Sequence, residues 1–426
     1  MAALAACGTQ GASNDAGPGD DGAPAESGAD GTSGGDANVP DDGAGPVDAG
    51  CGTGVLTQLS ATSGAVISGT IAHAGNGDAL AVWTQVDSND GGTNGAMYAA
   101  EHQGCTWGAP VQIQTLGNVA LTPHPPSLVA NQSTFVLLEW LGSATPPRVW
   151  TGSGMTSASG TFVNGLLGTD GTTFVDVMFN GQPGYTFSTS TDGLTWTAPA
   201  SAETVGTFED QIASGPGGVL AWATDSSTKQ ERARVWRQGA WSAPAMLSSY
   251  GYGACQAAVG NADAVIACLG PGLDGGADYL DVQLYDGSWH DLPPPKQVGA
   301  PTVVLLASDG ADYRLDYGNP PVGMILHAGT WSPAVNDMAS PYGSAGRSGE
   351  WSAITVDVQK GYSISRATGG AAFPTPTPLV PVSIPTGTWV GVTGAPFSGW
   401  AGRTDVAFVD GNGDGGANTL YVGLDL

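Results

Sequence analysis

The sequence is poor in charged residues and in the residues that favour helices. Charged residues make up only 12% of the 426 residues, and apolar residues do not recur at helical spacing over any long segment. These shortages argue against an α-helical protein. No run of 18 apolar residues occurs, which predicts that no helix spans a membrane. In contrast, 68 glycines, 29 prolines and 13 tryptophans indicate many short strands joined by tight turns.

Basic residues are scarcer than acidic ones. Lys and Arg number 11 against 38 Asp and Glu, which gives a formal net charge of −27. Such a surface repels phosphate groups and anionic lipid, so we expect no nucleic acid partner and no direct binding to a bilayer. A protein or a glycan is the expected partner, and we expect a monomer.

The first fifty residues differ from the rest of the chain. Residues 8–50 are rich in Gly, Ala and Asp and contain no aromatic residue, Leu, Ile or Met. Such a segment cannot bury enough apolar surface to offset the entropy of ordering. We therefore expect a disordered acidic tether over residues 8–50 and a single folded domain over residues 51–426.

The first seven residues end in Leu4-Ala-Ala-Cys7. This stretch resembles the bacterial lipobox, in which small residues precede a cysteine that is lipidated after cleavage. The resemblance implies that residues 1–7 are the remnant of a signal peptide whose start lies upstream of Met1. It also implies a bacterial envelope protein, anchored to the outer membrane or the cell surface through Cys7, or else a secreted protein. A cytosolic protein with an Ala-rich start is the alternative.

Four cysteines lie in the expected folded domain. An even number of cysteines in an exported protein favours disulfides. Cys255 and Cys268 flank a predicted hairpin, so we expect them to pair, which leaves Cys51 and Cys105 as a second pair. Four buried free thiols are the alternative.

A repeat of about 45 residues runs through the folded region. Its marker is a turn glycine followed by Trp and often Pro, found at Trp107, Trp196, Trp241, Trp289 and Trp331, with Phe373 as a degenerate copy. The gap from Trp107 to Trp196 has room for two units, so Phe162 is the expected marker of the missing one. Short apolar segments before each marker give four short strands per unit. This pattern is typical of a β-propeller.

The two ends of the folded region complement each other. Residues 404–426 contain only the second and third strands of a unit, and residues 54–60 can supply its outer strand. Such sharing would close the ring without a free edge. The markers therefore predict an all-β propeller of eight four-stranded blades, closed by the N-terminal strand. Seven blades are the alternative, because the units around residues 166–204 and 349–385 are irregular.

Residues 190–196 read Ser-Thr-Asp-Gly-Leu-Thr-Trp. In a turn Asp192 can accept backbone N–H bonds, Gly193 permits a positive φ, and Trp196 can pack between sheets. Together with Ser190 they resemble, in a shorter form, the Asp-box of the sialidase (BNR) β-propellers. The resemblance implies a structural turn at the edge of a blade, away from the catalytic centre.

The catalytic residues of that family are not found. Sialidases bind the sugar carboxylate with three arginines, the first usually in an Arg-Ile-Pro context, and use a Tyr–Glu nucleophile pair and an Asp. No Arg-Ile-Pro occurs here, and the first repeat unit contains no Lys or Arg. We therefore predict no catalytic residue and a propeller that serves as a binding or scaffolding module. A secreted glycan-active enzyme, sialidase-like or another glycoside hydrolase with its site at the channel, is the alternative.

Two further clusters point to ligands. Asp410, Asn412 and Asp414 match the start of a calcium-binding loop, although the Glu expected at the twelfth position is replaced by Tyr421. A structural calcium ion is the only cofactor that the sequence suggests, and a polar hairpin loop is the alternative. The basic residues Lys229, Arg232, Arg234 and Arg237 lie close together, which indicates a solvated strand face or an anion-binding patch.

The remaining ionisable residues show no catalytic spacing. The five histidines (His73, His102, His124, His290 and His327) form no metal-binding motif, so we interpret them as structural or surface residues. Glu139, next to Trp140 in an otherwise apolar strand, is the carboxylate most worth locating in three dimensions. A catalytic carboxylate pair would converge only in the fold.

Overall fold

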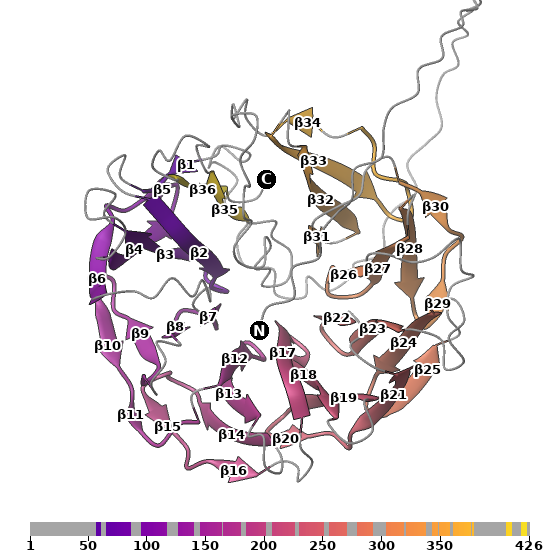
Figure 1. Ribbon diagram of the computed structural model, residues 1–426, viewed down its shortest axis with the longest axis horizontal. Helices are drawn as coiled ribbons and strands as arrows, with labels where there is room; N and C mark the ends of the chain where they lie inside the picture. Colours follow the sequence, from indigo (N-terminus) through magenta and orange to yellow (C-terminus); the bar gives the residue numbers. More distant parts are fainter. Residues whose placement is uncertain are drawn as a thin grey trace, which may run out of the picture. The chain divides into compact units, whose positions relative to one another are not determined.

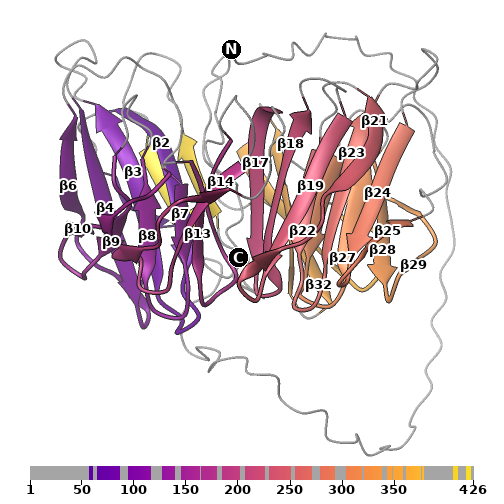
Figure 2. The same ribbon diagram turned by 90° about the horizontal axis from the view of Figure 1, so that it is seen from below.

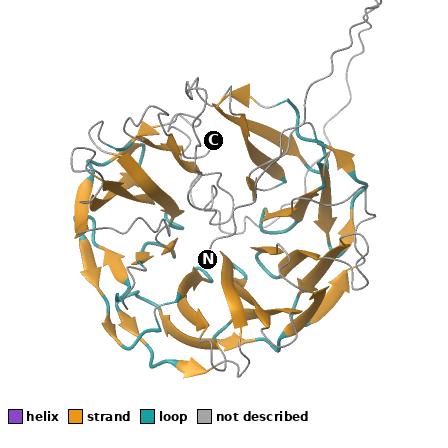
Figure 3. Ribbon diagram, in the orientation of Figure 1, coloured by secondary structure: helices purple, strands orange, loops and turns teal. Residues whose placement is uncertain are grey.

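Strands and connecting turns make up the part of the chain that the computed structural model describes, without any helix (Figure 3). The described residues are 57–60, 65–86, 95–116, 127–139, 145–163, 165–179, 185–201, 207–225, 230–250, 255–270, 279–292, 304–318, 321–337, 343–347, 349–357, 361–375, 377–378, 406–410 and 419–423. Within them no helix is long and apolar enough to cross a membrane.

Most strands form consecutive antiparallel sheets of four or five strands (Figure 1). The first three sheets are β2 (Ala65–His73), β3 (Ala79–Val86), β4 (Gly95–Gln103), β5 (Thr106–Trp107) and β6 (Val111–Leu116); β7 (Ser127–Ala130), β8 (Phe135–Leu138), β9 (Arg148–Trp150) and β10 (Met155–Ser157); and β12 (Leu166–Thr169), β13 (Phe174–Phe179), β14 (Tyr185–Ser190) and β16 (Ala200–Ser201).

The next four sheets follow in chain order. They are β17 (Thr207–Gly215), β18 (Gly218–Asp225), β19 (Gln230–Arg237), β20 (Ala240–Trp241) and β21 (Ala245–Tyr250); β22 (Cys255–Val259), β23 (Ala264–Gly270), β24 (Tyr279–Tyr285) and β25 (Trp289–Leu292); β26 (Val304–Ser308), β27 (Tyr313–Tyr317), β28 (Val322–His327), β29 (Thr330–Trp331) and β30 (Val335–Asn336); and β31 (Gly343–Arg347), β32 (Glu350–Asp357), β33 (Gly361–Thr368) and β34 (Thr377–Pro378).

Two pairings join segments that are distant in the chain. The N-terminal strand β1 (Thr57–Gln58) pairs antiparallel with β36 (Thr419–Gly423), which in turn pairs with β35 (Val406–Asp410), so the described part of this sheet has three strands. The short strand β11 (Ser159–Gly160) pairs in parallel with β15 (Thr195–Trp196), and the two form a separate two-stranded sheet. The pairing of β1 agrees with the expected role of residues 54–60 as an added strand.

Successive sheets contact each other through their first strands. Strand β2 lies against β7, β7 against β12, and the same relation continues through β17, β22, β26 and β31 (Figure 1). The side view in Figure 2 shows long strands of different sheets, such as β3 and β18, standing upright in the same view. Strand β35 lies against β2. Apolar clusters fill the space between neighbouring sheets, such as Leu80 with Leu137 and Val265 with Leu315. Sheets that follow in chain order and pack face to face in this way are the architecture of a β-propeller.

The repeat markers lie in these inter-sheet clusters. Each marker aromatic packs at the boundary between its own sheet and the preceding one; these residues are Trp107, Trp196, Trp241, Trp289, Trp331 and Phe373. Phe162, the expected marker of the missing unit, lies between β11 and β12 and is not among the residues of these clusters. In its sheet Trp150 on β9 takes the boundary position, and its Nε1 donates to Glu101 Oε2 at 2.8 Å.

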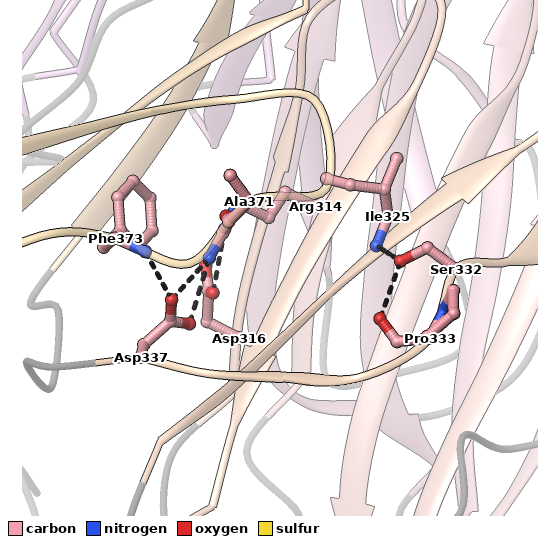
Figure 4. Close-up of polar contacts among 8 residues, drawn as sticks. All are labelled: Arg314, Asp316, Ile325, Ser332, Pro333, Asp337, Ala371 and Phe373. Atoms are coloured by element: carbon pink, nitrogen blue, oxygen red, sulfur yellow. Dashed lines mark hydrogen bonds and ion pairs between the residues drawn. The ribbon is translucent and has the colours of Figure 1, made fainter. Parts of the chain in front are cut away.

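A serine follows two of the marker tryptophans, and its hydroxyl accepts a hydrogen bond from a backbone N–H that a strand carbonyl would otherwise accept. Ser332 N donates to the Ile325 carbonyl at 2.7 Å, and Ser332 Oγ accepts from Ile325 N at 2.9 Å (Figure 4). Ser242 makes the same two bonds with Val235. The hydroxyl thereby satisfies a backbone donor at the place where the following prolines prevent a regular ladder.

The turns between the first and second strands of neighbouring sheets are hydrogen-bonded to each other. Gly75 N donates to the Asn131 carbonyl at 3.0 Å, Gly217 N to Gly260 O at 2.7 Å, and Asn261 N to Gly310 O at 2.7 Å. These bonds satisfy backbone groups that would otherwise need water or side-chain partners, and they link one sheet to the next.

Candidate functional site

The turn over residues 190–196, which carries the Asp-box-like sequence, is held by its own side chains. Asp192 Oδ1 accepts hydrogen bonds from the backbone N–H groups of Leu194 and Thr195 at 2.8 and 2.7 Å and from the Ser190 hydroxyl at 2.9 Å. The bond from Thr195, followed by those from Leu194 and Ser190, lowers the pKa of Asp192 below its ordinary value. Gly193 N donates to Ser190 Oγ at 2.8 Å, and Trp196 Nε1 donates to the Gly193 carbonyl.

This turn also clamps the preceding sheet. A Cβ atom on Gly193, whose φ is 72°, would lie 2.5 Å from Val136 Cγ2. Ser159 N donates to the Leu194 carbonyl at 2.8 Å where β11 pairs with β15, and Trp196 is buried among residues of both sheets. The hydrogen bonds of this turn therefore fix its shape, and the contacts of Gly193, Leu194 and Trp196 hold it against the preceding sheet.

The most unusual cluster lies between the sheet β26–β30 and the sheet β31–β34 (Figure 4). Arg314, on β27, has no exposed surface, and its Nε donates to Asp316 Oδ1 at 2.9 Å. Its Nη2 donates to both oxygens of Asp337 at 2.9 and 3.0 Å, and its Nη1 donates to the Ala371 carbonyl at 3.0 Å. The ring of Phe373 lies 3.9 Å from the guanidinium carbon. The name buried ion cluster is used below for Arg314, Asp316 and Asp337.

The buried ion cluster contains one cation and two carboxyl groups. Burial raises the pKa of Asp316 to about 8; the adjacent Arg314 opposes this rise and the Asp337 carboxylate adds to it. Burial thus favours the protonated form of Asp316, in which the cluster holds one cation, Arg314, beside one carboxylate. Gly323 lies opposite Asp316 on β28, and a Cβ there would come within 2.4 Å of Arg314 Nη2. The guanidinium thus occupies space that a side chain would fill.

Sequence reasoning missed this cluster. Its members come from β27 and from the residue after β30, and its backbone partners are Ala371 and Phe373. No spacing rule predicts that these segments meet. One local signal was present: the strand Tyr313–Tyr317 carries charges at its second and fourth residues, where an apolar strand of this repeat carries aliphatic ones.

Glu139, the carboxylate singled out from the sequence, is paired. It is 3% exposed and forms an ion pair with Arg148 of β9. Arg148 also donates to the Ile113 carbonyl at 3.3 Å, and burial lowers its pKa. Glu139 thus contributes to the boundary between two sheets.

A Ser, a His and an Asp meet where an exposed turn leads into β25. His290 Nε2 lies 2.9 Å from Asp286 Oδ1 and 3.0 Å from Ser288 Oγ. In a catalytic triad the serine and the carboxylate contact opposite nitrogens of the imidazole, so that the base is oriented while it takes the serine proton. Here both contacts use the same nitrogen, so this arrangement has no relay geometry.

The other predicted residues lie at separate places. Cys255 and Cys268 face each other on β22 and β23 and form a disulfide. Cys105 is also disulfide-bonded. Asp410 ends β35, Arg232 and Arg234 lie half-buried on β19, and Arg237 Nη2 donates to the Asn261 carbonyl. The following lie outside the described residues: Cys7, Cys51, His124, Lys229, Asn412 and Asp414.

The other described histidines differ in their exposure. His73 and His102 are buried, and the exposed His327 contacts Asp312 Oδ1 through Nδ1 at 2.7 Å. In the part of the chain that the structure describes, no group of three or more His, Cys, Asp or Glu residues is placed to hold a metal ion.

No protein-family model matches this sequence, and no curated protein matches it either. Solved structures with a similar fold include β-propeller proteins and a polysaccharide lyase. The β-propeller domain of the Trilobed protease from Pyrococcus furiosus is 7% identical, with 85% of this chain and 95% of that chain covered and a TM-score of 0.44.

Two other similar structures are those of a polysaccharide lyase and a lectin. The polysaccharide lyase Uly1 is 10% identical, with 86% of this chain and 90% of that chain covered and a TM-score of 0.44. A lectin from Aleuria aurantia, solved in complex with Fucα1-6GlcNAc, is 11% identical, with 78% and 100% covered and a TM-score of 0.37. Similarities of this size leave the functional argument to the chain's own residues.

Proposed function

We propose that this protein is a bacterial envelope lipoprotein whose β-propeller binds or scaffolds another molecule. One observation carries the proposal: several buried ionisable side chains make structural contacts within and between the sheets. Glu139 pairs with Arg148, Tyr313 binds Asp263, and Arg314 is enclosed by two carboxyls. A scaffold of this kind presents loops on a rigid frame.

The proposed frame has eight blades. Seven sheets of four or five strands run from β2 to β34 in the described residues, and the sheet of β35, β36 and β1 is the proposed eighth blade. In this arrangement β1 closes the ring. Deletion of residues 1–60, which removes β1, should lower the melting temperature markedly, whereas deletion of residues 1–50 should not. Equal melting temperatures for the two deletions would contradict closure by β1.

The proposed anchor is a lipid on Cys7, with residues 8–50 as a flexible spacer between the envelope and the propeller. Its support is the lipobox-like sequence and the low apolar content of the spacer. Mass spectrometry of the N-terminal peptide from the producing cells should find a diacylglycerol-modified Cys7 at the new N-terminus. An unmodified peptide that continues upstream of Cys7 would contradict the anchor.

The binding proposal is tested with the full chain on a glycan array and, in parallel, with a panel of chromogenic glycosides. We expect binding without turnover. Turnover that survives purification to homogeneity would instead favour a glycan-active enzyme with its site at the propeller channel. If no glycan binds, the ligand is a protein, which cross-linking in cells would identify.

A further inference from the structure

Strand β27 is built differently from the second strands of other sheets. In β3, β8, β13 and β23 the second and fourth residues are buried and apolar: Leu80 and Val82, Val136 and Leu138, Val175 and Val177, Val265 and Ala267. In β27 these positions hold Arg314 and Asp316. Apolar residues of similar volume often stabilise a core as well as a buried ion cluster or better. Filling the core therefore does not require this cluster.

The buried ion cluster joins two sheets through bonds that depend on its charges. Arg314 Nη1 donates to the Ala371 carbonyl at 3.0 Å, and Asp337 Oδ1 accepts from Phe373 N at 2.7 Å. Both partners lie after β33, in the segment that leads to β34. Asp337 Oδ1 also accepts a hydrogen bond from Arg314 Nη2. One oxygen atom thus accepts both from Arg314 of the sheet β26–β30 and from Phe373, which follows β33 of the next sheet.

We propose that Arg314, Asp316 and Asp337 form a pH-sensitive latch between the sheet β26–β30 and the sheet β31–β34. The latch is closed while Asp316 carries a proton, because the cluster then holds one cation and one anion. When Asp316 releases its proton to solvent, a second buried anion competes with Asp337 for the Arg314 guanidinium. The contacts to Ala371 and Phe373 then weaken, because an uncompensated buried charge is costly.

In the part of the chain that the structure describes, no further charged group near Asp316 balances this change. It lies opposite Leu305 on β26 and Gly323 on β28. The next sheet packs with apolar side chains, including Trp351 and Ala353, against this boundary. Among the described residues, the charged groups that act on Asp316 are Arg314 and Asp337.

The direction of the pH effect follows from the pKa of Asp316, which rises from an ordinary 3.8 to about 8 in the folded protein. Because the folded state binds this proton more tightly than the unfolded state, protonation of Asp316 stabilises the fold fully below about pH 4. This contribution falls as the pH rises and is lost above about pH 8. The latch itself opens around the folded-state value.

Hydrogen–deuterium exchange of the full chain tests the latch. In the wild type, after correction for the intrinsic pH dependence, peptides that contain Ala371–Phe373 should exchange about tenfold faster at about pH 9 than at about pH 6.5. In Asp316→Asn, which keeps the shape without the charge, this difference should disappear. Asp291→Asn, an exposed position on β25, removes one charge elsewhere and should behave as the wild type. Equal protection of the wild type at both pH values, or an unchanged difference in Asp316→Asn, would overturn the proposal.

A direct measurement covers the case in which Asp316→Asn does not fold. Infrared spectra of wild-type protein with ¹³C-labelled aspartate report protonated carboxyl groups through their C=O stretch. We expect a protonated aspartate at about pH 6.5 that ionises near pH 8. If every aspartate is already ionised at about pH 6.5, the latch has no proton to release and the proposal is wrong.

Discussion

The hydroxyl of Tyr313 donates a 2.6 Å hydrogen bond to Asp263 Oδ1 across the boundary between two consecutive sheets. It also accepts a hydrogen bond from Gly260 N at 2.9 Å. Tyr313 and Arg314 are adjacent on β27 and point to opposite faces of their sheet, as neighbours on a strand do. The sheet β26–β30 is therefore tied to the preceding sheet by a tyrosine and to the following sheet by an arginine.

Tyr313→Phe should lower the free energy of unfolding by about 1–2 kcal/mol, because it removes both hydrogen bonds from a buried site.

Tyr313→Phe should also change how the free energy of unfolding depends on pH. Burial raises the pKa of Asp263 and the Tyr313 hydrogen bond lowers it, so loss of the hydroxyl raises this pKa further. A raised folded-state pKa makes stability fall as pH rises, so the loss in Tyr313→Phe should be larger at pH 7 than at pH 4. Chemical denaturation at both pH values measures this, with Tyr285→Phe, which keeps the ring contact with Trp289, as control.

Gly193→Ala should destabilise the protein more than Gly239→Ala. Both glycines have a positive φ, 72° and 84°, so both substitutions carry the backbone cost of about 1 kcal/mol. At Gly193 the new methyl group also meets Val136 and Val149, whereas Gly239 has nothing within 4 Å of its Cβ position. We expect an extra loss of about 1–3 kcal/mol for Gly193→Ala from overpacking. Equal melting temperatures for the two variants would show that the turn over residues 190–196 does not clamp the preceding sheet.

Ser332→Ala should cost about 1 kcal/mol, because Ile325 N loses the acceptor that replaces a ladder bond. Ser332→Thr should restore most of this stability, since Thr197 fills the same role in another sheet, where its Oγ1 accepts from Thr189 N at 2.9 Å. Thermal unfolding of the three proteins is the measurement. A Thr variant no better than the Ala variant would argue against the hydroxyl as the stabilising group.

Removal of the disulfide between Cys255 and Cys268 should lower stability by about 2–3 kcal/mol, the range for a loop of this length. The double variant Cys255→Ala with Cys268→Ala is compared with the wild type by chemical denaturation. The variant should still respond to reductant, because Cys105 is also disulfide-bonded. A double variant as stable as the wild type would contradict a stabilising role for this bond.

The features that sequence revealed well are those that repeat or are local. The marker tryptophans, such as Trp241 and Trp331, could be recognised because each packs at the same place in its own sheet. The hairpin that brings Cys255 opposite Cys268 could be recognised from two short apolar runs around a polar turn. Local turn chemistry likewise predicted the hydrogen bonds of Asp192.

The features that sequence did not reveal depend on contacts between distant segments. Spacing alone predicts Phe162 as a marker. A marker aromatic packs against the preceding sheet, and here Trp150 makes this contact, with residues such as Leu80. Glu139, beside an aromatic residue in an apolar strand, looks like a candidate catalytic carboxylate in the sequence. In the fold it pairs with Arg148 on β9, a contact that the local sequence does not indicate. The contact of Arg314 with Ala371 joins residues that no local pattern relates.

The pairing of β1 with β36 has a consequence for the synthesis of the protein. Thr57 leaves the ribosome before the strands from β2 to β35 have been synthesised, whereas its partner Val422 leaves it after them. The backbone groups of β1 that bind β36 therefore stay without this partner while the intervening sheets are made. Pairing between such distant segments slows folding and exposes strand edges to other chains in the meantime. A chain that stops before β36 leaves β1 without its partner, so this sheet depends on segments that are made far apart in time.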